Sequence, residues 1–189
     1  MAFYYSVKQT VKEFLQIAII SLAIVLPIRY FLVQPFYVKG ASMEPNFHDS
    51  EYLLIDELSY RFREPKRGEV VVIHANGSIK DFYIKRIIGL PGERVVIGGG
   101  IVTVSSYGDA SSVRFSETYL PEGLLTSGDV SMTLGPDDFF VLGDNRPSSL
   151  DSRFIGAIQR SAIVGRAWIR GWPFDRFATF EAPLYPSSN

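Results

Sequence analysis

The sequence predicts a mainly β domain with one transmembrane helix at its N-terminus. Three observations lead to this prediction: an apolar segment near the N-terminus, a series of short segments rich in β-branched and aromatic residues after it, and turn residues between those segments. The chain has 189 residues, which is enough for one domain with its own core and a small appendage. We therefore expect an N-terminal tip and helix over residues 1–35 and a β-rich domain over residues 36–189.

The apolar segment runs from Phe14 to Val33 and reads FLQIAIISLAIVLPIRYFLV. At about 1.5 Å per residue, a helix of this length crosses a hydrocarbon layer of about 30 Å. Arg29 lies near the far end of the segment, where its long stem lets the guanidinium reach the membrane interface. The segment therefore predicts one membrane span.

Basic residues indicate the orientation of this span. Lys8 and Lys12 precede it, and basic residues favour the cytoplasmic side of a membrane, although Arg29 and Lys39 weaken the bias. We expect a cytoplasmic N-terminus and a β domain outside the cytoplasm. A cleaved secretory signal is the alternative, because residues 38–40 fit a small-x-small cleavage site. The length of the apolar segment and the aromatic residues at its end favour an anchor.

Seven short segments beyond residue 50 predict strands, because each is rich in β-branched and aromatic residues and ends at turn residues. These segments are Glu51–Leu58, Glu69–Ala75, Asp81–Ile88, Arg94–Ile97, Ile101–Val104, Phe139–Gly143 and Ala162–Gly171. Gly98–Gly100 predicts a tight hairpin between two of them. Residues 105–132 are rich in Ser, Gly and Asp and predict an insertion or a small subdomain. The end of the chain, residues 183–189, is expected to fray.

Composition excludes several functions. The formal net charge is −1, so no surface of one sign is expected to attract nucleic acid, and no nucleic-acid partner is predicted. With no cysteine, the chain has no disulfide, no thiol nucleophile and no Cys-based zinc site. Its two histidines, His48 and His74, are too few for most metal sites and are expected to be structural. We therefore predict no metal and no cofactor.

Ser42, in the segment GASMEP, is a candidate nucleophile whose base must be a residue other than histidine. A lysine can serve when burial lowers its pKa from about 10.4 towards about 7–8. Lys85 is the candidate, because it lies in the middle of a predicted strand, where alternation places it on the face opposite to Arg86. Strands also often carry an exposed lysine, so the structural interpretation stays open on this evidence alone.

A third segment, VLGDNRPSSLDSRFIG over residues 141–156, leads from an apolar strand into a turn dense in hydroxyl and charged groups. Loops of this kind either cap local structure or orient a site. Asp151 and Arg153 fit a surface ion pair worth under about 1 kcal/mol. A serine in the same segment fits equally well a group that orients a neutral lysine amine.

Taken in this order, the three segments resemble the bacterial type I signal peptidases, which are membrane-bound Ser/Lys proteases that remove signal peptides from exported proteins. GASMEP is similar to the S-M-x-P box, YIKRIIGLPGE to the K-R-x-x-G-x-P-G-[DE] box, and GDNRPSSLDSRFIG to the G-D-N-x-x-x-S-x-D-S-R-x-x-G box. REPKRGEVVVI resembles the R-G-[DE]-[VI]-[VI] strand of the family. The resemblance covers most of the chain and implies a signal-peptidase-like antiparallel β-sheet domain with one N-terminal transmembrane helix.

The resemblance also implies roles for the matching residues. Ser42 is expected to be the nucleophile, Lys85 the general base, and Ser149 the serine that hydrogen-bonds the lysine. The supporting residues are expected in four groups: Asp151 with Arg153 steadying the loop of the serine; Gly40, Ala41, Met43 and Pro45 forming the loop of the nucleophile; Gly143, Asp144, Asn145 and Arg146 forming a tight turn near the site; and Arg86 binding an acidic partner.

Two positions depart from the family pattern. Gly40 stands where some members place a serine whose hydroxyl helps to bind the oxyanion, so the oxyanion is expected to rely on backbone N–H groups, with that of Ser42 as the first candidate. Asn46 replaces the usual threonine after Pro45. Neither change removes the serine or the lysine.

The implied partners are preproteins with small residues before the cleavage site, and membrane lipid. The implied location is a cell membrane crossed once, with the catalytic domain outside the cytoplasm, or a thylakoid membrane with the domain in the lumen. An extended substrate is expected to pair with a strand edge such as Asp81–Ile87. Four aromatic residues are candidates either for contact with lipid or for the core: Trp168, Trp172, Phe174 and Phe177.

Two other classes of protein fit parts of this pattern. Cytosolic Ser/Lys self-cleaving repressors share the chemistry, but they carry a DNA-binding domain where this chain has an apolar segment. A membrane-tethered β module without enzymatic activity would contain Ser42 and Lys85 only by chance. The distance between the Ser42 hydroxyl and the Lys85 amine, expected at about 3 Å in an enzyme, separates these alternatives.

Overall fold

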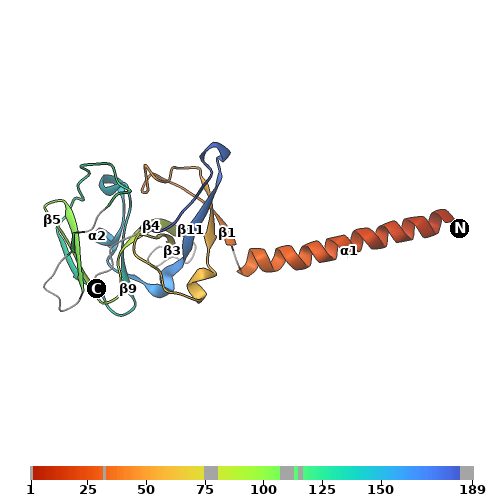
Figure 1. The fold of residues 1–189 in the computed structure, drawn as a ribbon, viewed down its shortest axis with the longest axis horizontal. Helices are drawn as coiled ribbons and strands as arrows, with labels where there is room; N and C mark the ends of the chain where they lie inside the picture. Colours follow the sequence, from red (N-terminus) through yellow and green to blue (C-terminus); the bar gives the residue numbers. More distant parts are fainter. Residues whose placement is uncertain (1, 32, 75–80, 107–112, 115–116, 184–189) are drawn as a thin grey trace.

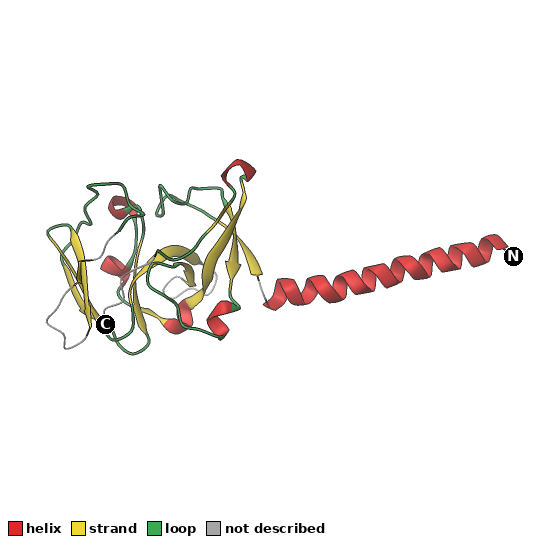
Figure 2. Cartoon of the chain, viewed as in Figure 1, coloured by secondary structure: helices red, strands yellow, loops and turns green. Residues whose placement is uncertain are grey.

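A long helix, α1, projects from a β-rich domain in the computed structural model (Figure 1, Figure 2). The structure describes residues 2–31, 33–74, 81–106, 113–114 and 117–183. Part of the predicted insertion, the end of one predicted strand at Ala75, and the C-terminal end beyond residue 183 lie outside the described residues.

Helix α1 spans Ala2–Phe31. Its segment Gln9–Leu26 is long and apolar enough to cross a membrane, and none of that segment is buried against the rest of the protein. A helix that exposes apolar side chains all round suits a lipid environment rather than water. The prediction that the helix continues to Val33 is wrong, because Val33 already pairs with Asp56 in the first strand.

The larger sheet contains eight antiparallel strands among the described residues, and this confirms the predicted fold class. The strand order is β1-β2-β11-β3-β4-β9-β10, with β12 pairing to β11. The strands are β1 (Val33–Tyr37), β2 (Tyr52–Asp56), β3 (Val70–His74), β4 (Phe82–Gly89), β9 (Asp138–Leu142), β10 (Ile158–Gln159), β11 (Ile163–Trp172) and β12 (Ala178–Thr179).

A second sheet of four described strands lies beside the end of β4, in the order β7-β6-β5-β8 (Figure 1). Its strands are β5 (Glu93–Gly98), β6 (Ile101–Ser106), β7 (Val113–Arg114) and β8 (Val130–Thr133). The predicted hairpin joins β5 to β6, and Gly99 and Gly100 both take the positive φ angles that such a tight turn needs. Residues 105–132 therefore contribute β7, β8 and the end of β6 to this sheet.

Short helical turns connect the strands. They are η1 (Ser59–Arg61), η2 (Arg146–Ser148), α2 (Ser152–Ile155), η3 (Arg160–Ala162) and η4 (Phe174–Arg176). Two of them, η2 and α2, follow β9 within the segment that the sequence singled out for its hydroxyl and charged groups.

Apolar side chains cover both faces of the larger sheet. In β3, Val70 and Val72 pack into one cluster with Met43 and Phe47, whereas Val71 and Ile73 pack into another on the opposite face. In a strand that is buried on both faces, apolar residues do not alternate with polar ones. This is why residues 70–73 form a continuous apolar run. A third cluster, around Val95, Ile97 and Phe140, joins the second sheet to β4 and β9.

All seven predicted strands are present, and the strands that the sequence missed are short or lie at an edge. Strand β1 contains Pro35, which cannot donate a hydrogen bond to a neighbouring strand. The position of β1 at the edge of the sheet tolerates this proline, since β2 is the one described strand that pairs with it. Strands β7, β10 and β12 have two residues each, too few to show any period.

Candidate active site

Ser42 lies on a tight loop, residues 40–47, which we call the Ser42 loop. Its turns are closed by hydrogen bonds from the Glu44 N–H to the Ala41 carbonyl (3.2 Å) and from the Phe47 N–H to the Met43 carbonyl (3.0 Å). Met43 and Phe47 are each 1% exposed and insert into the cluster above β3. The loop is thus fixed from below by two apolar side chains, while Ser42 itself stays half-buried and Pro45 exposed.

Gly40 begins this loop with a φ of +93°, a conformation that residues with a side chain rarely adopt. Its N–H donates to the Asp49 carboxylate at 2.7 Å. This backbone conformation favours glycine at position 40. The N–H of Gly40 is already used, whereas no described residue accepts a hydrogen bond from the N–H of Ser42.

Lys85 extends from β4 to Ser42, and its Nζ lies 2.9 Å from the Ser42 Oγ. The amine also donates to the Ile84 carbonyl at 2.8 Å. Lys85 is only 2% exposed, and this burial lowers its pKa to about 8, against the opposing effect of the Asp151 and Asp144 charges. The distance meets the criterion of about 3 Å that separates an enzyme from a chance pair.

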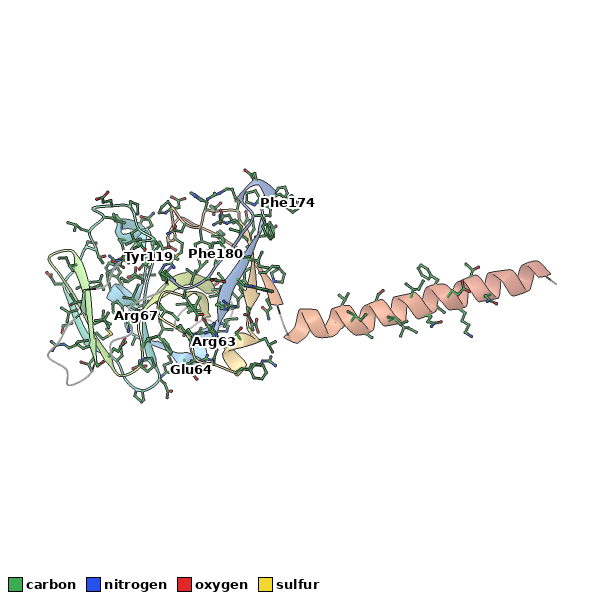
Figure 3. The ribbon with its side chains drawn as sticks, in the orientation of Figure 1. Arg63, Glu64, Arg67, Tyr119, Phe174 and Phe180 are labelled. Carbon is green, nitrogen blue, oxygen red and sulfur yellow. The ribbon has the colours of Figure 1, made fainter. Side chains whose placement is uncertain are left out.

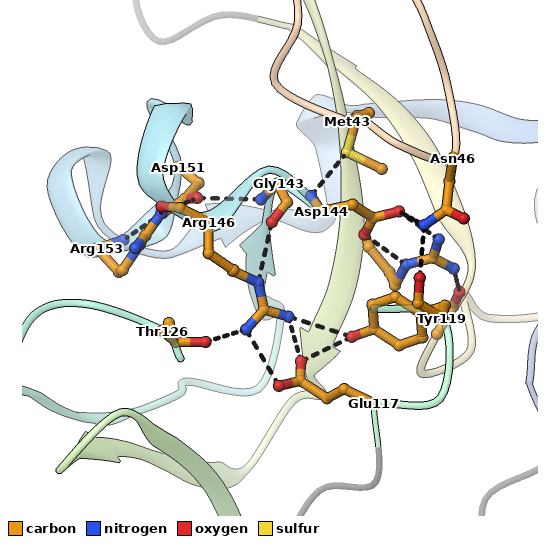
Figure 4. A network of polar contacts seen from close by, with 12 residues as sticks. Met43, Asn46, Glu117, Tyr119, Thr126, Gly143, Asp144, Arg146, Asp151 and Arg153 are labelled. Atoms are coloured by element: carbon orange, nitrogen blue, oxygen red, sulfur yellow. Dashed lines mark hydrogen bonds and ion pairs between the residues drawn. The ribbon is translucent and has the colours of Figure 1, made fainter. Parts of the chain in front are cut away.

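Arg86, the next residue of β4, points to the opposite face and forms a buried ion pair with Asp144. Its Nε and Nη2 donate to the two carboxylate oxygens at 2.8 and 2.6 Å, which confirms the expected acidic partner. Asn46 donates to the same carboxylate at 2.9 Å and to the Tyr119 carbonyl at 2.9 Å (Figure 4). The amide at position 46 therefore joins the Ser42 loop to the ion pair, a contact that explains its presence.

The turn after β9 holds the Ser42 loop from a second side. The Asn145 N–H donates to the Ser42 carbonyl at 3.0 Å, and the Asn145 amide donates to the Ala41 carbonyl at 3.0 Å. The Asp144 N–H contacts the Met43 sulfur at 3.4 Å (Figure 4). Three segments that are far apart in the sequence therefore meet around one serine.

Asp151 anchors the loop that carries Ser149. Its carboxylate accepts the Gly143 N–H at 3.0 Å and pairs with the Arg153 Nε at 2.8 Å. Arg153 continues to the Arg146 carbonyl at 2.8 Å (Figure 4). Asp151 and Arg153 thus form a buried ion pair, and not the surface pair that the sequence also allowed.

Ser149 is 9% exposed, and its hydroxyl has no hydrogen-bond partner among the described residues. The expected hydrogen bond to Lys85 is not formed in the structure, where the lysine amine contacts Ser42 and the Ile84 carbonyl. The Ser149 hydroxyl packs against Gly143, which lies between Ser149 and the Ser42 carbonyl.

Arg146 is buried and fastens the region 117–126 to the turn. It donates to the Gly143 carbonyl at 3.0 Å, pairs with Glu117, and contacts Thr126 (Figure 4). Sequence reasoning placed Arg146 near the site but missed Glu117 and Thr126. Their region has no periodic pattern, and their separation from Arg146 in the chain leaves no local signal.

A pocket with both apolar and polar walls opens beside Ser42 and Lys85, and sequence reasoning did not identify its lining. Its walls come from β1, β2, β3 and β4 and from the start of the Ser42 loop. The lining residues are Phe36, Tyr37, Val38, Lys39, Ser42, Leu53, Val72, Phe82, Tyr83, Ile84 and Lys85.

The histidines take structural positions. His48 lies 3.7 Å from Glu44 on the exposed side of the Ser42 loop, and His74 packs its ring against Phe82 in β4. The hydrogen bonds of the described residues join neither imidazole to Ser42. The serine therefore has a lysine, and not a histidine, within reach.

Fold and site together describe a β domain on an apolar helix, with a serine hydroxyl beside a buried lysine amine. Residues 11–172 match the family model for signal peptidase, peptidase S26. The chain belongs to this signal peptidase family.

Similar proteins span most of the chain. They include a signal peptidase I of Leptolyngbya laminosa, 34% identical over 87% of this chain and 81% of that protein, and a signal peptidase I of Bacillus caldolyticus, 36% identical over 84% and 90%. A probable signal peptidase I-2 of Synechocystis is 37% identical over 82% of this chain and 71% of that protein. A solved signal peptidase I of Enterococcus faecalis is 26% identical and covers 55% of this chain and 97% of that one, with a TM-score of 0.46.

Gly143 gives a test of the contact between the Ser42 loop and the loop that carries Ser149. A Cβ at position 143 would lie 2.4 Å from the Ser42 carbonyl oxygen and 2.2 Å from the Ser149 hydroxyl, so Gly143→Ala forces the two loops apart. We expect it to lower the free energy of unfolding by about 1–3 kcal/mol, measured by denaturant titration of the full chain in detergent micelles. Gly98→Ala is the control, since its Cβ meets nothing within 4 Å, and we expect a change within about 0.5 kcal/mol. Equal effects of the two substitutions would contradict the described contact.

Proposed function

We propose that the protein is a type I signal peptidase that uses Ser42 as its nucleophile and the neutral amine of Lys85 as its general base to cleave signal peptides from preproteins. The observation that carries this proposal is the distance of 2.9 Å between the Ser42 Oγ and the buried Lys85 Nζ. Membership of the signal peptidase family supports it over a cytosolic repressor or a non-enzymatic module.

Burial of Lys85 prepares it to accept a proton. Its pKa falls from 10.5 to about 8, which corresponds to roughly 3 kcal/mol of disfavour for the charged form. In the neutral state, the Ser42 hydroxyl donates its hydrogen bond to the amine lone pair. The amine takes that proton as the serine oxygen attacks the substrate carbonyl carbon.

The same amine then completes the reaction. Protonated Lys85 donates its proton to the nitrogen of the departing chain, and the peptide C–N bond breaks to leave an ester on Ser42. The neutral amine next takes a proton from a water molecule, whose oxygen attacks the ester carbonyl. The proton returns to the Ser42 oxygen, and the signal peptide leaves with a free carboxylate.

The oxyanion of the tetrahedral intermediate requires hydrogen-bond donors. The N–H of Ser42 has no acceptor among the described residues, whereas the N–H of Gly40 binds Asp49. We therefore assign the N–H of Ser42 to the oxyanion. Asn145 supports this assignment, because it fixes the carbonyl groups of Ala41 and Ser42 and so the orientation of the loop backbone.

Ser149 is proposed to bind Lys85 during the reaction. A buried hydroxyl without a partner among the described residues costs free energy, and the protonated Lys85 amine would offer it a partner. Gly143 leaves the space through which the two loops approach one another, since any side chain at this position would overlap the Ser149 hydroxyl.

The substrate is proposed to lie in extended form beside β4. Strand β9 pairs with β4 only from Arg86 onward, so the edge of β4 at Phe82–Lys85 is not covered by β9. A peptide added to this edge brings its alternate side chains towards the pocket beside Ser42. Because the pocket has aliphatic and aromatic walls that include Val38 and Leu53, it suits small apolar side chains before the scissile bond.

Membrane lipid is proposed to contact an aromatic row beside the helix. Tyr37, Tyr52 and Trp172 are neighbours in the register of β1, β2 and β11, and each is 50% exposed. Phe174 packs on Trp172 and lies at the side of the domain from which α1 projects (Figure 3). Exposed aromatic residues suit the membrane interface.

The other two aromatic candidates, Trp168 and Phe177, are also exposed, so none of the four is a core residue. In the proposed topology, α1 crosses the membrane once with its N-terminus in the cytoplasm. The catalytic domain then lies on the other side of a cell membrane, or in the lumen of a thylakoid.

Substitution of either residue of the pair tests the function. We expect Ser42→Ala and Lys85→Met each to reduce cleavage of a purified preprotein by at least about 10³-fold, measured with the full chain in detergent, because each removes one half of the proton transfer. Ser161→Ala and Lys66→Met change exposed residues of the same types and are expected to leave the rate unchanged. Full activity of either active-site variant would refute the proposal.

The pKa of Lys85 predicts the dependence on pH. Only the neutral amine accepts the serine proton, so kcat/KM is expected to rise about tenfold per pH unit below about 8 and to level off above it. The measurement is a series of initial rates with a soluble signal-peptide substrate. A rate that stays constant across this range would show that another group acts as the base.

Fluorescence tests the lipid contact. The chain has two tryptophans, so Trp168→Phe leaves Trp172 as the reporter. We expect lipids brominated near the headgroup to quench Trp172 in vesicles, relative to matched vesicles without bromine, because the aromatic row lies at the interface. Fluorescence that is the same in both kinds of vesicle would place this row in water.

A further inference from the structure

Arg170 is a buried cation of β11 that takes no part in the proposed proton transfer. It is 6% exposed, and its Nε lies 2.8 Å from the Glu51 carboxylate. The same guanidinium donates to the backbone carbonyl of Asn46, in the Ser42 loop. One side chain thus binds both a buried acid and the loop of the proposed nucleophile.

Two aromatic rings lie beside this guanidinium. Its central carbon lies 5.5 Å from the centre of the Phe47 ring and 5.1 Å from that of Phe180. The two rings also contact one another, with centres 4.5 Å apart. Because Phe47 belongs to the Ser42 loop and Phe180 follows β12, the cation binds the loop to the C-terminal part of the described chain.

Glu51 explains why a cation is needed at this position. Its side chain is 2% exposed and pairs with Arg170 and, at 3.1 Å, with Arg176. The Glu51 carbonyl accepts the N–H of Val38, just before the Ser42 loop. A buried acid that loses its partner is strongly destabilising. Arginine can serve the acid and the Asn46 carbonyl at once with its planar fork of donors, whereas lysine presents a single ammonium group.

Asn46 is held from two directions. Its side chain binds Asp144, the partner of Arg86, and its carbonyl binds Arg170. The Asn46 N–H donates to the carbonyl of Met43 at 3.1 Å and so closes a turn. Met43 is the residue that follows Ser42. The contact of Arg170 therefore acts on the turn that presents Ser42, although it touches neither the serine nor the lysine.

We propose that Arg170 is a positioning residue that holds the Ser42 loop at the distance from Lys85 that proton transfer requires. This inference rests on the proposed roles of Ser42 and Lys85. Because proton transfer depends on a contact of 2.9 Å, a loop displaced by about 1 Å is expected to lose about 10²-fold in rate. The pocket beside Ser42 contains neither Arg170 nor Asn46, so substrate binding is expected to change little.

Arg170→Lys tests this role, since it keeps a positive charge beside Glu51 and removes the planar fork. With the full chain in detergent and a preprotein substrate, we expect kcat to fall at least about tenfold while KM stays within about twofold. Arg170→Met is expected to lower kcat further. Arg166→Lys is the matched control, because Arg166 lies in the same strand and pairs with Asp56 at 3.0 Å, and no hydrogen bond or ion pair of the described residues joins it to the Ser42 loop. Its kcat is expected to stay unchanged.

The melting temperature of each variant is measured in the same micelles. Wild-type kcat in Arg170→Lys would overturn the proposal. A loss of kcat that follows the unfolded fraction in Arg170→Lys or Arg170→Met would also overturn it, because the residue would then serve folding alone. Activity in Ser42→Ala, measured in the same assay, would instead refute the proposed function and is a separate result.

Discussion

The hydrogen bond between the Lys85 amine and the Ser42 hydroxyl is the contact around which the rest of the domain is arranged. The two residues are 43 positions apart, one in the middle of β4 and the other on a loop after β1. Local structure cannot bring them together, so the sheet and its two covering clusters must do so. The same packing excludes water from the amine, which lowers its pKa and makes a lysine suitable as a base.

The neighbouring residue in β4 gives this arrangement its rigidity. Arg86 and Asp144 form a buried ion pair on the other face of the strand, and Asp144 also binds Asn46 of the Ser42 loop. A buried ion pair is weak evidence for stability, since removing two charges from water is costly. Its geometry is demanding, however, so this pair admits few alternative placements of the loop and the turn relative to β4.

Much of the fold and the centre of the site could be predicted from the sequence, because both leave local patterns. Strong apolar runs identified the strands, and simple alternation placed Lys85 and Arg86 on opposite faces. Strand β1 was missed because Val33 was assigned to the apolar segment of the helix, and Gln34 and Pro35 interrupt the apolar residues of the rest of the strand. Arg170 was missed because a lone arginine near the end of a strand has the same pattern as an exposed residue.

Other contacts were beyond prediction because they depend on tertiary packing. Glu117 binds Arg146, which lies 29 positions later in the chain, and the sequence around Glu117 has no regular pattern of apolar residues. Most of the pocket lining comes from four strands, and no single segment of the sequence predicts the order of these strands in the sheet. Ser149 shows the reverse case: its motif implied a hydrogen bond to Lys85, whereas the structure leaves its hydroxyl buried without a described partner.

The junction between α1 and β1 has a mechanical consequence. One residue separates the end of the helix at Phe31 from the start of the strand at Val33, and β1 is tied at once to β2. A connection of one residue cannot extend far, so in the proposed topology the Ser42 hydroxyl would lie within a narrow range of heights above the bilayer. The enzyme would then select the peptide bond by its height above the lipid as much as by the side chains beside it.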